Sequence, residues 1–347
     1  MLRCVPYDES LREAWDELAI SRGTIFHTTA FRQVLLHSFG YRCGYHGVVD
    51  DSGRLRVLLP LVLGRNLSGR RAGVALPFVN YTDICADGEE SYRFAAASLL
   101  TLRQQLGLNY LEIRLKDQDP EWEGWQVQRH NVTFELPLAA DEDQILALSS
   151  GSNRNHVRKA YKHDDFAVSF ENDHLEDFYR VYVQRMKQLG SPAPDIAFFR
   201  AFFAYLPDNT YLLTVLDRKT KRVIGGMLLL TSPANRMLYY PYGANRVEYN
   251  AKYLNNFMYW EAVRFGIRQG LERLDLGRSP VGSGTYRYKE QWGAQAIPLQ
   301  YMVYTGGCDR MGPPDRERFR PAVEIWKRLP AWITDRLGRR LIPYVMP

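Results

Sequence analysis

Hydrophobic and polar positions along the chain follow two periods, one typical of helices and one typical of half-buried strands. In the first part of the chain they predict helices over residues 9–21, 29–38 and 89–106, and strands over 44–49, 55–63, 111–115 and 132–138. In the second part they predict helices over 175–189, 196–205 and 254–269, and strands over 166–170, 211–216, 222–231, 237–242, 271–276 and 300–304. The sequence therefore predicts a mixed α/β protein.

A short internal match indicates that this α/β unit occurs twice. The segment that starts at Gly107 reads GLNYLEI, and the segment that starts at Gly270, 163 residues later, reads GLERLDL. Each follows a predicted helix and opens a predicted strand, as a helix-ending glycine does. We therefore expect two related domains, over residues 1–145 and 146–305, and a tail over residues 306–347.

Composition narrows the class of protein. The chain has 347 residues, 46% of them hydrophobic, and 45 basic against 39 acidic residues, a formal net charge of +6. A chain of this length usually forms more than one hydrophobic core. The opening residues lack the apolar core of a signal peptide, and Cys4, Cys43, Cys85 and Cys308 lie far apart. We therefore expect a cytoplasmic protein with no metal site and no disulfide scaffold.

A basic segment near residue 152 is the first candidate site. If it is helical, Arg154, Arg158 and Lys162 lie on one stripe with Lys159 beside it. Such a stripe can hold phosphate groups, because arginine binds them through two hydrogen bonds. A solvated surface helix is the alternative, although acidic residues are nearly absent nearby.

The second candidate is Glu261, which lies in the middle of the apolar face of the helix predicted over residues 254–269. A buried carboxylate requires a partner or a shifted pKa. Arg264, Arg268 or Arg278 could pair with it. Glu261 is therefore either part of a structural brace or a general base.

The third candidate is the segment 274–293, where a strand ends at Gly277 and a loop rich in glycine and serine follows. It brings Asp275, Arg278, Ser279, Tyr286, Tyr288, Lys289 and Trp292 into a short stretch. A cation among aromatic side chains can bind a phosphate or stabilise the oxyanion of an acyl-transfer intermediate. Packing in the core is the competing interpretation for Tyr286 and Trp292.

The order of elements resembles the GNAT acyltransferase plan, used twice. Enzymes of that plan hold the pyrophosphate of acyl-CoA in a glycine-containing loop before the long helix. The corresponding stretch here runs from Arg246 to Ala251 and has Tyr249 at the central glycine position. We expect this ring to crowd the pyrophosphate, so a donor other than acyl-CoA becomes attractive.

Three blocks together resemble the Fem-type (FemABX) aminoacyltransferases, which are tandem GNAT proteins. The blocks are the basic segment 153–160, Trp260-Glu261, and LDLGRS at 274–279 with GTYRYK at 284–289 and Trp292-Gly293. The resemblance implies transfer of an aminoacyl group to an amine of a peptidoglycan precursor, with aminoacyl-tRNA as donor and no tightly bound cofactor. It also implies that Lys289 stabilises negative charge at the ester carbonyl or contacts donor phosphate. Arg154, Arg158 and Lys159 would hold phosphates, and Arg278 and Ser279 would line the cleft.

A narrower resemblance comes from LPFVNY at 76–81 and IWKRLP at 325–330, which are similar to the FemAB-related branch associated with PEP-CTERM and exopolysaccharide loci. It adds Asn80 and Tyr81 to the substrate-binding candidates. No general base stands out; Asp275, Glu261, water or the substrate itself could take the proton.

The sequence thus predicts an N-acyl or aminoacyl transferase that acts on an amine of a cell-envelope precursor. The alternatives are an acyl-CoA-dependent N-acetyltransferase for an amino sugar and a binding component of an exopolysaccharide system that has no activity. The tail, with eight basic and four acidic residues over 313–347, either contacts an anionic membrane or packs back on the first domain.

Overall fold

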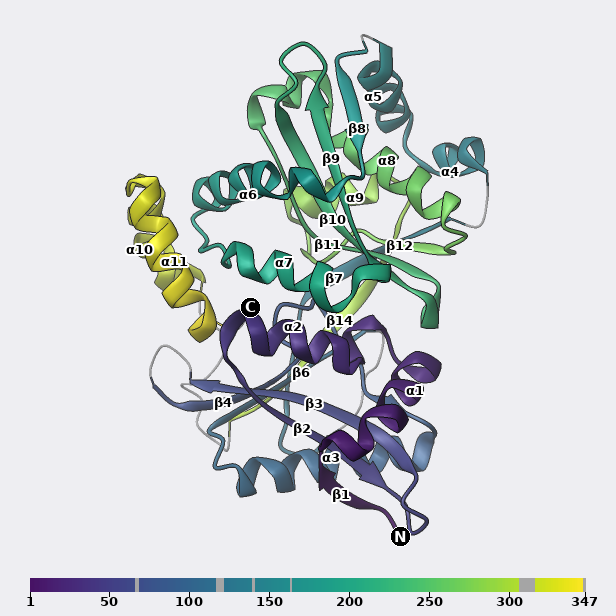
Figure 1. Cartoon of the computed structure of the whole chain (residues 1–347), viewed down its shortest axis with the longest axis vertical. Helices are drawn as coiled ribbons and strands as arrows, with labels where there is room; N and C mark the ends of the chain where they lie inside the picture. Colours follow the sequence, from purple (N-terminus) through teal and green to yellow (C-terminus); the bar gives the residue numbers. More distant parts are fainter. Residues whose placement is uncertain (66–68, 117–121, 139–140, 163, 306–315, 346–347) are drawn as a thin grey trace.

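The computed structural model describes residues 1–65, 69–116, 122–138, 141–162, 164–305 and 316–345. Figure 1 shows one sheet that runs through both halves of the molecule, with helices on its faces. The strands that form the path follow the order β1-β2-β3-β4-β6-β14-β7-β12-β11-β10-β9-β8. Cys308 and the start of the tail lie outside the described residues.

The first half contains the helices and strands that the sequence predicts for it. Its strands are β1 (Arg3–Pro6), β2 (Arg42–Val49), β3 (Leu55–Arg65), β4 (Arg71–Ala75), β5 (Cys85–Ala86), β6 (Tyr110–Lys116) and β7 (Gln126–Pro137). Its helices are α1 (Arg12–Arg22), α2 (Thr29–Phe39) and α3 (Glu89–Gln105). The periodicity did not reveal β1, β4 and β5, which are short.

The second half repeats the pattern. Its strands are β8 (Phe166–Ser169), β9 (Thr210–Asp217), β10 (Val223–Ser232), β11 (Met237–Asn245), β12 (Arg273–Asp275), β13 (Ser279–Pro280) and β14 (Gln295–Tyr304). Its helices are α4 (Glu142–Leu148), α5 (Gly151–Lys162), α6 (Leu175–Leu189), α7 (Ile196–Tyr205), α8 (Leu254–Arg268) and α9 (Gly284–Glu290). Helices α10 (Arg316–Arg328) and α11 (Ala331–Val345) form the tail.

The internal repeat is confirmed by the pairing of the strands. β4 pairs with β6 in parallel, and β11 pairs with β12 in parallel. In each half the pair before it is antiparallel, β3 with β4 and β10 with β11. Gly107 and Gly270 both adopt positive φ, +62° and +66°, directly before β6 and β12. The matched heptapeptides therefore occupy the same place in two copies of one unit.

Each half receives a strand from the other. β7, from the end of the first half, pairs with β12, and β14, from the end of the second half, pairs with β6. β7 and β14 also pair with each other and join the two sheets. The boundary at residue 145 stays a prediction, but the two units share a continuous sheet.

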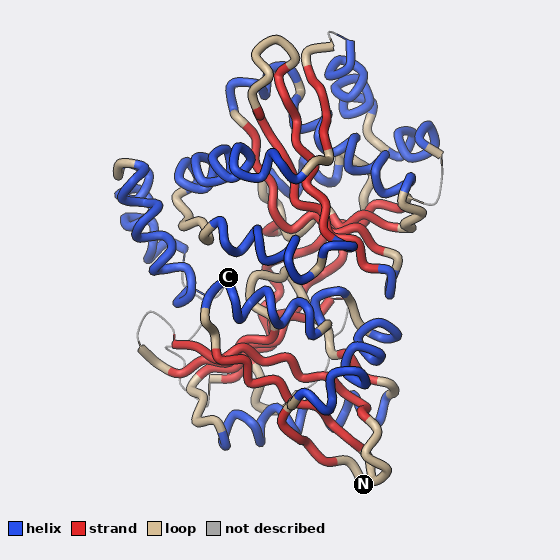
Figure 2. Tube along the Cα trace, viewed as in Figure 1, coloured by secondary structure: helices blue, strands red, loops and turns tan. Residues whose placement is uncertain are grey.

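Two helices pack face to face between the halves, as Figure 2 shows at the centre of the molecule. Phe31 and Phe39 of α2 lie 6.0 Å and 5.0 Å, between ring centroids, from Phe202 and Phe198 of α7. Aromatic pairs at such distances add to the free energy gained by burial. This contact between α2 and α7 fixes the distance between the two units.

The loop predicted after Gly277 is followed by helix α9 over residues 284–290, an element that was not predicted from the sequence. The side chain of Ser283 caps this helix and accepts a hydrogen bond from the Tyr286 amide at 3.2 Å. The glycines before it, which favoured a loop, adopt the turn that precedes the cap; Gly282 has φ +73°. The helix is short, and its cap and packing outweigh the weak local propensity.

Candidate active site

The candidate site lies where two parallel strands separate. β11 and β12 pair only as far as Tyr239 and Asp275. The chain then turns away from β11 at Gly277, where φ is +81°. On the other side, the register of β11 against β10 shifts at Tyr240 and Pro241. A bulge and a turn therefore open the sheet at one point.

A hollow open to solvent occupies this point, with about 260 Å³ of empty space. The second half contributes Tyr239, Tyr240 and Asp275, and the first half contributes Phe26, Asn80 and Tyr81. The hollow is thus shared by the two units, in the position that the repeat predicts for a cleft between them.

Asp275 supplies a carboxylate to the wall of the hollow, and 2% of its surface is exposed. It accepts hydrogen bonds from Tyr81 Oη at 2.7 Å, Thr133 Oγ1 at 2.8 Å and the Gly277 amide at 2.5 Å. Burial raises the pKa of Asp275, and the three donors oppose that rise. Asp275 is therefore better prepared to take up a proton than an ordinary carboxylate.

Gly277 connects this carboxylate to Lys289. The Lys289 Nζ donates to the carbonyl oxygens of Gly277 at 2.7 Å and Arg278 at 3.1 Å. Burial lowers the pKa of Lys289 to about 8, while Asp275 raises it and Arg278 lowers it further. An ammonium has three hydrogen-bond donors, so one N–H of Lys289 has no partner among the described residues. Lys289 lies behind Gly277 and is not among the residues that line the hollow.

Arg278 and Ser279 lie next to each other in the sequence but in different surroundings. Arg278 is exposed and donates to Tyr301 Oη at 2.6 Å, and that hydroxyl donates to the Asn80 carbonyl at 3.3 Å. Ser279 is fully buried, and its Oγ has no partner among the described residues. The structure thus brings the Arg278 side chain to the Asn80 side of the hollow.

The loop that carries Asn80 and Tyr81 is held in strained conformations. Leu76 and Phe78 adopt positive φ, +47° and +71°, which costs a non-glycine residue of order 1–3 kcal/mol. The Phe78 carbonyl accepts a hydrogen bond from Tyr242 Oη at 2.8 Å. The second half therefore fixes a loop of the first half in the shape that forms the hollow.

The basic side chains of the predicted phosphate stripe on α5 have two different surroundings. The Arg154 guanidinium donates to the carbonyl oxygens of Ala147 at 3.1 Å and Ser149 at 2.5 Å, at the end of α4. Arg158 and Lys159 are exposed, as the stripe predicts. Arg154 thus has a structural role, which the helical spacing could not reveal because its partners lie outside the helix.

Glu261 forms the brace that was one of its two predicted roles. It accepts hydrogen bonds from Tyr161 Oη at 2.5 Å and from Arg264 at 3.2 Å, and 4% of its surface is exposed. Of the predicted partners, Arg264 is the one in contact. None of these groups lines the hollow, so its role as a general base stays a prediction.

The aromatic residues of the third segment pack mainly in the core. Trp292 is fully buried and stacks on Tyr259 with 5.6 Å between centroids. Tyr288 packs edge-on against the same Tyr259, and Tyr286 packs edge-on against Phe134. Core packing, the competing interpretation for Tyr286 and Trp292, is what the structure shows for all three rings.

The loop before α8 does not leave its amides open. Residues Val247–Lys252 form a 3-10 turn, in which the Tyr249 amide donates to the Arg246 carbonyl at 3.1 Å. The Tyr249 hydroxyl donates to Asp217 at 3.0 Å, so the ring reaches toward the β9–β10 turn. The ring of His156, from α5, stacks on Tyr253 at the start of α8 with 4.6 Å between centroids. Two aromatic rings thus lie beside the start of α8, where no side chain caps the helix.

A comparison with known protein families gives a match in the second half of the chain. Residues 151–290 match the family model described as acetyltransferase (GNAT) domain. The match includes Asp275, Arg278 and Lys289, and it confirms the prediction of an acyltransferase. GNAT domains generally take their acyl group from acyl-CoA. A search among proteins of curated function gave no match.

Solved structures share the architecture of the whole chain at low identity. FemX superposes with a TM-score of 0.65 at 12% identity, over 92% of this chain and all of that one. The C-terminal domain of a putative lysylphosphatidylglycerol synthetase from Agrobacterium fabrum gives 0.59 at 12% identity, over 89% and 96% of the two chains. A tandem GNAT protein from the clavulanic acid biosynthesis pathway gives 0.57 at 11%, over 88% and 99%. The predicted tandem GNAT-like fold is thereby confirmed.

Sequence reasoning missed some residues of the hollow. Thr133 supplies one of the hydrogen bonds to Asp275, and Tyr240 and Phe26 form part of the wall. Thr133 lies on β7, the strand exchanged between the halves, so nothing local indicates its partner. In the described part of the chain, no helix is both long enough and apolar enough to cross a bilayer.

Proposed function

We propose that the chain transfers an acyl or aminoacyl group to an amine of a cell-envelope precursor, of the peptidoglycan or exopolysaccharide class, in the hollow between its halves. The observation that carries this proposal is the convergence of Lys289 and Asp275 on Gly277, at the point where β11 and β12 separate. One group is cationic and one can accept a proton, and both can accelerate acyl transfer to an amine.

In the proposed step the amine nitrogen attacks the carbonyl carbon of the activated donor, and a C–N bond forms. The carbonyl oxygen becomes negative and is stabilised by the Lys289 ammonium. The attacking nitrogen gives a proton to Tyr81, whose own proton passes to Asp275. The C–O or C–S bond to the carrier then breaks, and the proton held by Asp275 returns through Tyr81 to the carrier, which leaves.

The donor is proposed to be an aminoacyl ester, such as aminoacyl-tRNA, and no cofactor is tightly bound. One observation supports a donor other than ordinary acyl-CoA: the amide of Tyr249, at the position of the central glycine, is bonded within its own turn. The exposed Arg158 and Lys159 are proposed to contact phosphates of the donor or the acceptor.

A transfer assay tests the proposal. The protein is incubated with aminoacyl-tRNA labelled in the aminoacyl group and, as acceptor, a nucleotide-linked peptidoglycan precursor or an amino-sugar nucleotide. We expect an amide product heavier than the acceptor by one aminoacyl group. Tyr81→Phe removes the hydroxyl from Asp275 and should lower the rate by about 100-fold, whereas Tyr211→Phe, at a half-buried position on β9 outside the hollow, should not. Equal rates for the two variants would refute the relay.

The second candidate is an acyl-CoA-dependent N-acetyltransferase for an amino sugar, which the match to the acetyltransferase domain favours. Acetyl-CoA replaces aminoacyl-tRNA in the same assay, and its binding is followed by thermal shift. Tight binding of acetyl-CoA together with acetylation of the amino sugar would select this candidate over the first.

A further inference from the structure

We propose that the outer face of tail helix α11 binds the surface of an anionic lipid bilayer. Half of the large hydrophobic side chains that are exposed in the described residues lie on the tail or beside it: Leu189, Ile325, Trp332, Leu337, Leu341 and Tyr344. Trp332 is the most exposed of them, at 69%. A cluster of this kind marks an interaction surface.

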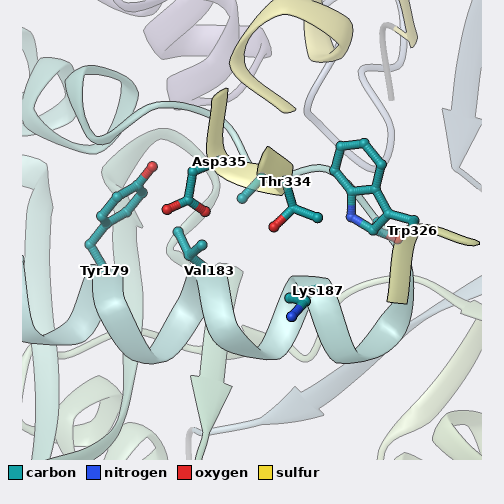
Figure 3. Close-up of a pocket in the computed structure, with 8 residues that line it drawn as sticks. Tyr179, Val183, Lys187, Trp326, Thr334 and Asp335 are labelled. Carbon is teal, nitrogen blue, oxygen red and sulfur yellow. The ribbon is translucent and has the colours of Figure 1, made fainter. Parts of the chain in front are cut away.

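These apolar side chains are exposed even though the tail is packed against the rest of the protein. Its inner side is seated on α6, where Trp326, Thr334 and Asp335 face Tyr179, Val183 and Lys187 around a small hollow (Figure 3). Arg339 forms an ion pair with Asp195 at 2.8 Å, and the Pro343 carbonyl accepts a hydrogen bond from Tyr41 Oη at 3.0 Å. The tail therefore packs on both halves and still presents a second, outward face.

That outward face is cationic as well as apolar. Arg336 and Arg340 lie one helical turn apart and are exposed, and neither makes a hydrogen bond or ion pair among the described residues. The acidic residue of α11, Asp335, lines the hollow on the inner side. At 100° per residue, the two arginines lie between Trp332 and the group of Leu337, Leu341 and Tyr344.

This pattern distinguishes a bilayer from a protein partner. Arginine is also enriched at protein interfaces, but the outward face of α11 presents its two arginines without a carboxylate, so it complements a surface of uniform negative charge. At a bilayer surface the apolar side chains enter the acyl boundary while the arginines remain among lipid phosphates. Over residues 313–347 the tail has eight basic and four acidic residues, which favours an anionic surface.

The tail also lies close to the candidate site in the structure. Tyr41, which bonds to the end of α11, lies 6.3 Å between ring centroids from Phe78. Phe78 belongs to the strained loop that supplies Asn80 and Tyr81 to the hollow. A bound tail would thus hold the hollow near the bilayer, where a lipid-linked acceptor is found. That last point rests on the proposed function, whereas membrane binding itself does not.

Vesicle co-sedimentation of the full chain tests the inference. The probes are phosphatidylcholine vesicles with and without phosphatidylglycerol. We expect binding to the anionic vesicles, lost by about 30-fold in the double variant R336Q/R340Q, since each basic residue at the surface contributes about 1 kcal/mol. W332S should also weaken binding. The matched control R3Q/R12Q removes two exposed arginines of the first half and should bind like the wild type.

Two outcomes would overturn the inference: no binding of the wild type to anionic vesicles, or equal binding of R336Q/R340Q and the control. Self-association that W332S abolishes, without vesicle binding, would assign the face to a second copy of the chain. The transfer assay with a water-soluble acceptor is run on the same variants. Loss of vesicle binding with transfer unchanged concerns the tail alone, and absence of transfer with vesicle binding intact concerns the proposed function alone.

Discussion

Replacement of Lys289 by methionine isolates the cost of holding a cation in the candidate site. Lys289 is 7% exposed, and burial lowers its pKa from 10.5 to about 8. Such a shift corresponds to about 3 kcal/mol of unfavourable free energy for the charged form in the native state. Methionine removes that cost but leaves the carbonyls of Gly277 and Arg278 without this donor, at about 1–3 kcal/mol. Near neutral pH the two effects nearly cancel.

The difference in the free energy of unfolding between the wild type and Lys289→Met nevertheless changes with pH. The sign of this change follows from the direction in which the pKa of Lys289 is shifted. Between the native and unfolded pKa values of Lys289, the unfolded wild-type chain holds one more proton than the native protein. The contribution of Lys289 to the free energy of unfolding therefore rises with pH in that range. From about pH 7 to about pH 9.5, the wild type should gain about 2 kcal/mol relative to Lys289→Met.

Urea unfolding of the wild type and the variant, followed by circular dichroism at several pH values, measures this difference. Lys219→Met serves as the control, because Lys219 is exposed at the β9–β10 turn and water surrounds it in both states. Its difference from the wild type should not change with pH. A difference for Lys289→Met that is equally flat would refute the lowered pKa and the reasoning built on it.

Three further changes test individual contacts. Gly277→Ala places a Cβ 3.5 Å from Asn80 Nδ2 at a position with φ +81°, so it should cost about 1–2 kcal/mol in thermal unfolding and lower the transfer rate. Arg264→Met leaves Glu261 buried with a neutral partner, and it should lower the free energy of unfolding by about 3 kcal/mol in urea titrations. Arg154→Ala should lower thermal stability while donor affinity, measured by titration, stays unchanged; a weaker affinity would restore Arg154 to the phosphate stripe.

The parts of the fold that local pattern governs were predictable. Helices α6 and α7 begin and end at the predicted residues, because each has a clear apolar face and a clear stop. The exchange of β7 and β14 between the halves was not predictable, because a strand's pattern shows which face is buried but not which neighbour it pairs with. The tail was predicted as two exclusive alternatives, whereas the structure packs one side of it and exposes the other.

The same limit applies to the candidate site. Asp275 and Lys289 could be proposed from the sequence because a strand end and a nearby cation are local signals. Thr133, on the exchanged strand, carried no such signal. Arg154 was placed in a phosphate stripe because helical spacing identifies a shared face, but its carbonyl partners lie at the end of another helix. Contacts between distant segments decide these roles, and a single sequence does not specify them.

The central claim is that the Lys289 ammonium, which Gly277 connects to Asp275 of the shared hollow, stabilises the negative charge of an acyl-transfer intermediate. The most direct test is the single-turnover rate of transfer from a labelled aminoacyl donor, compared among the wild type, Lys289→Met and Lys219→Met. The account predicts a loss of about 100-fold or more for Lys289→Met, with native circular dichroism retained, and no loss for Lys219→Met. A folded Lys289→Met protein that transfers the acyl group at the wild-type rate would contradict it.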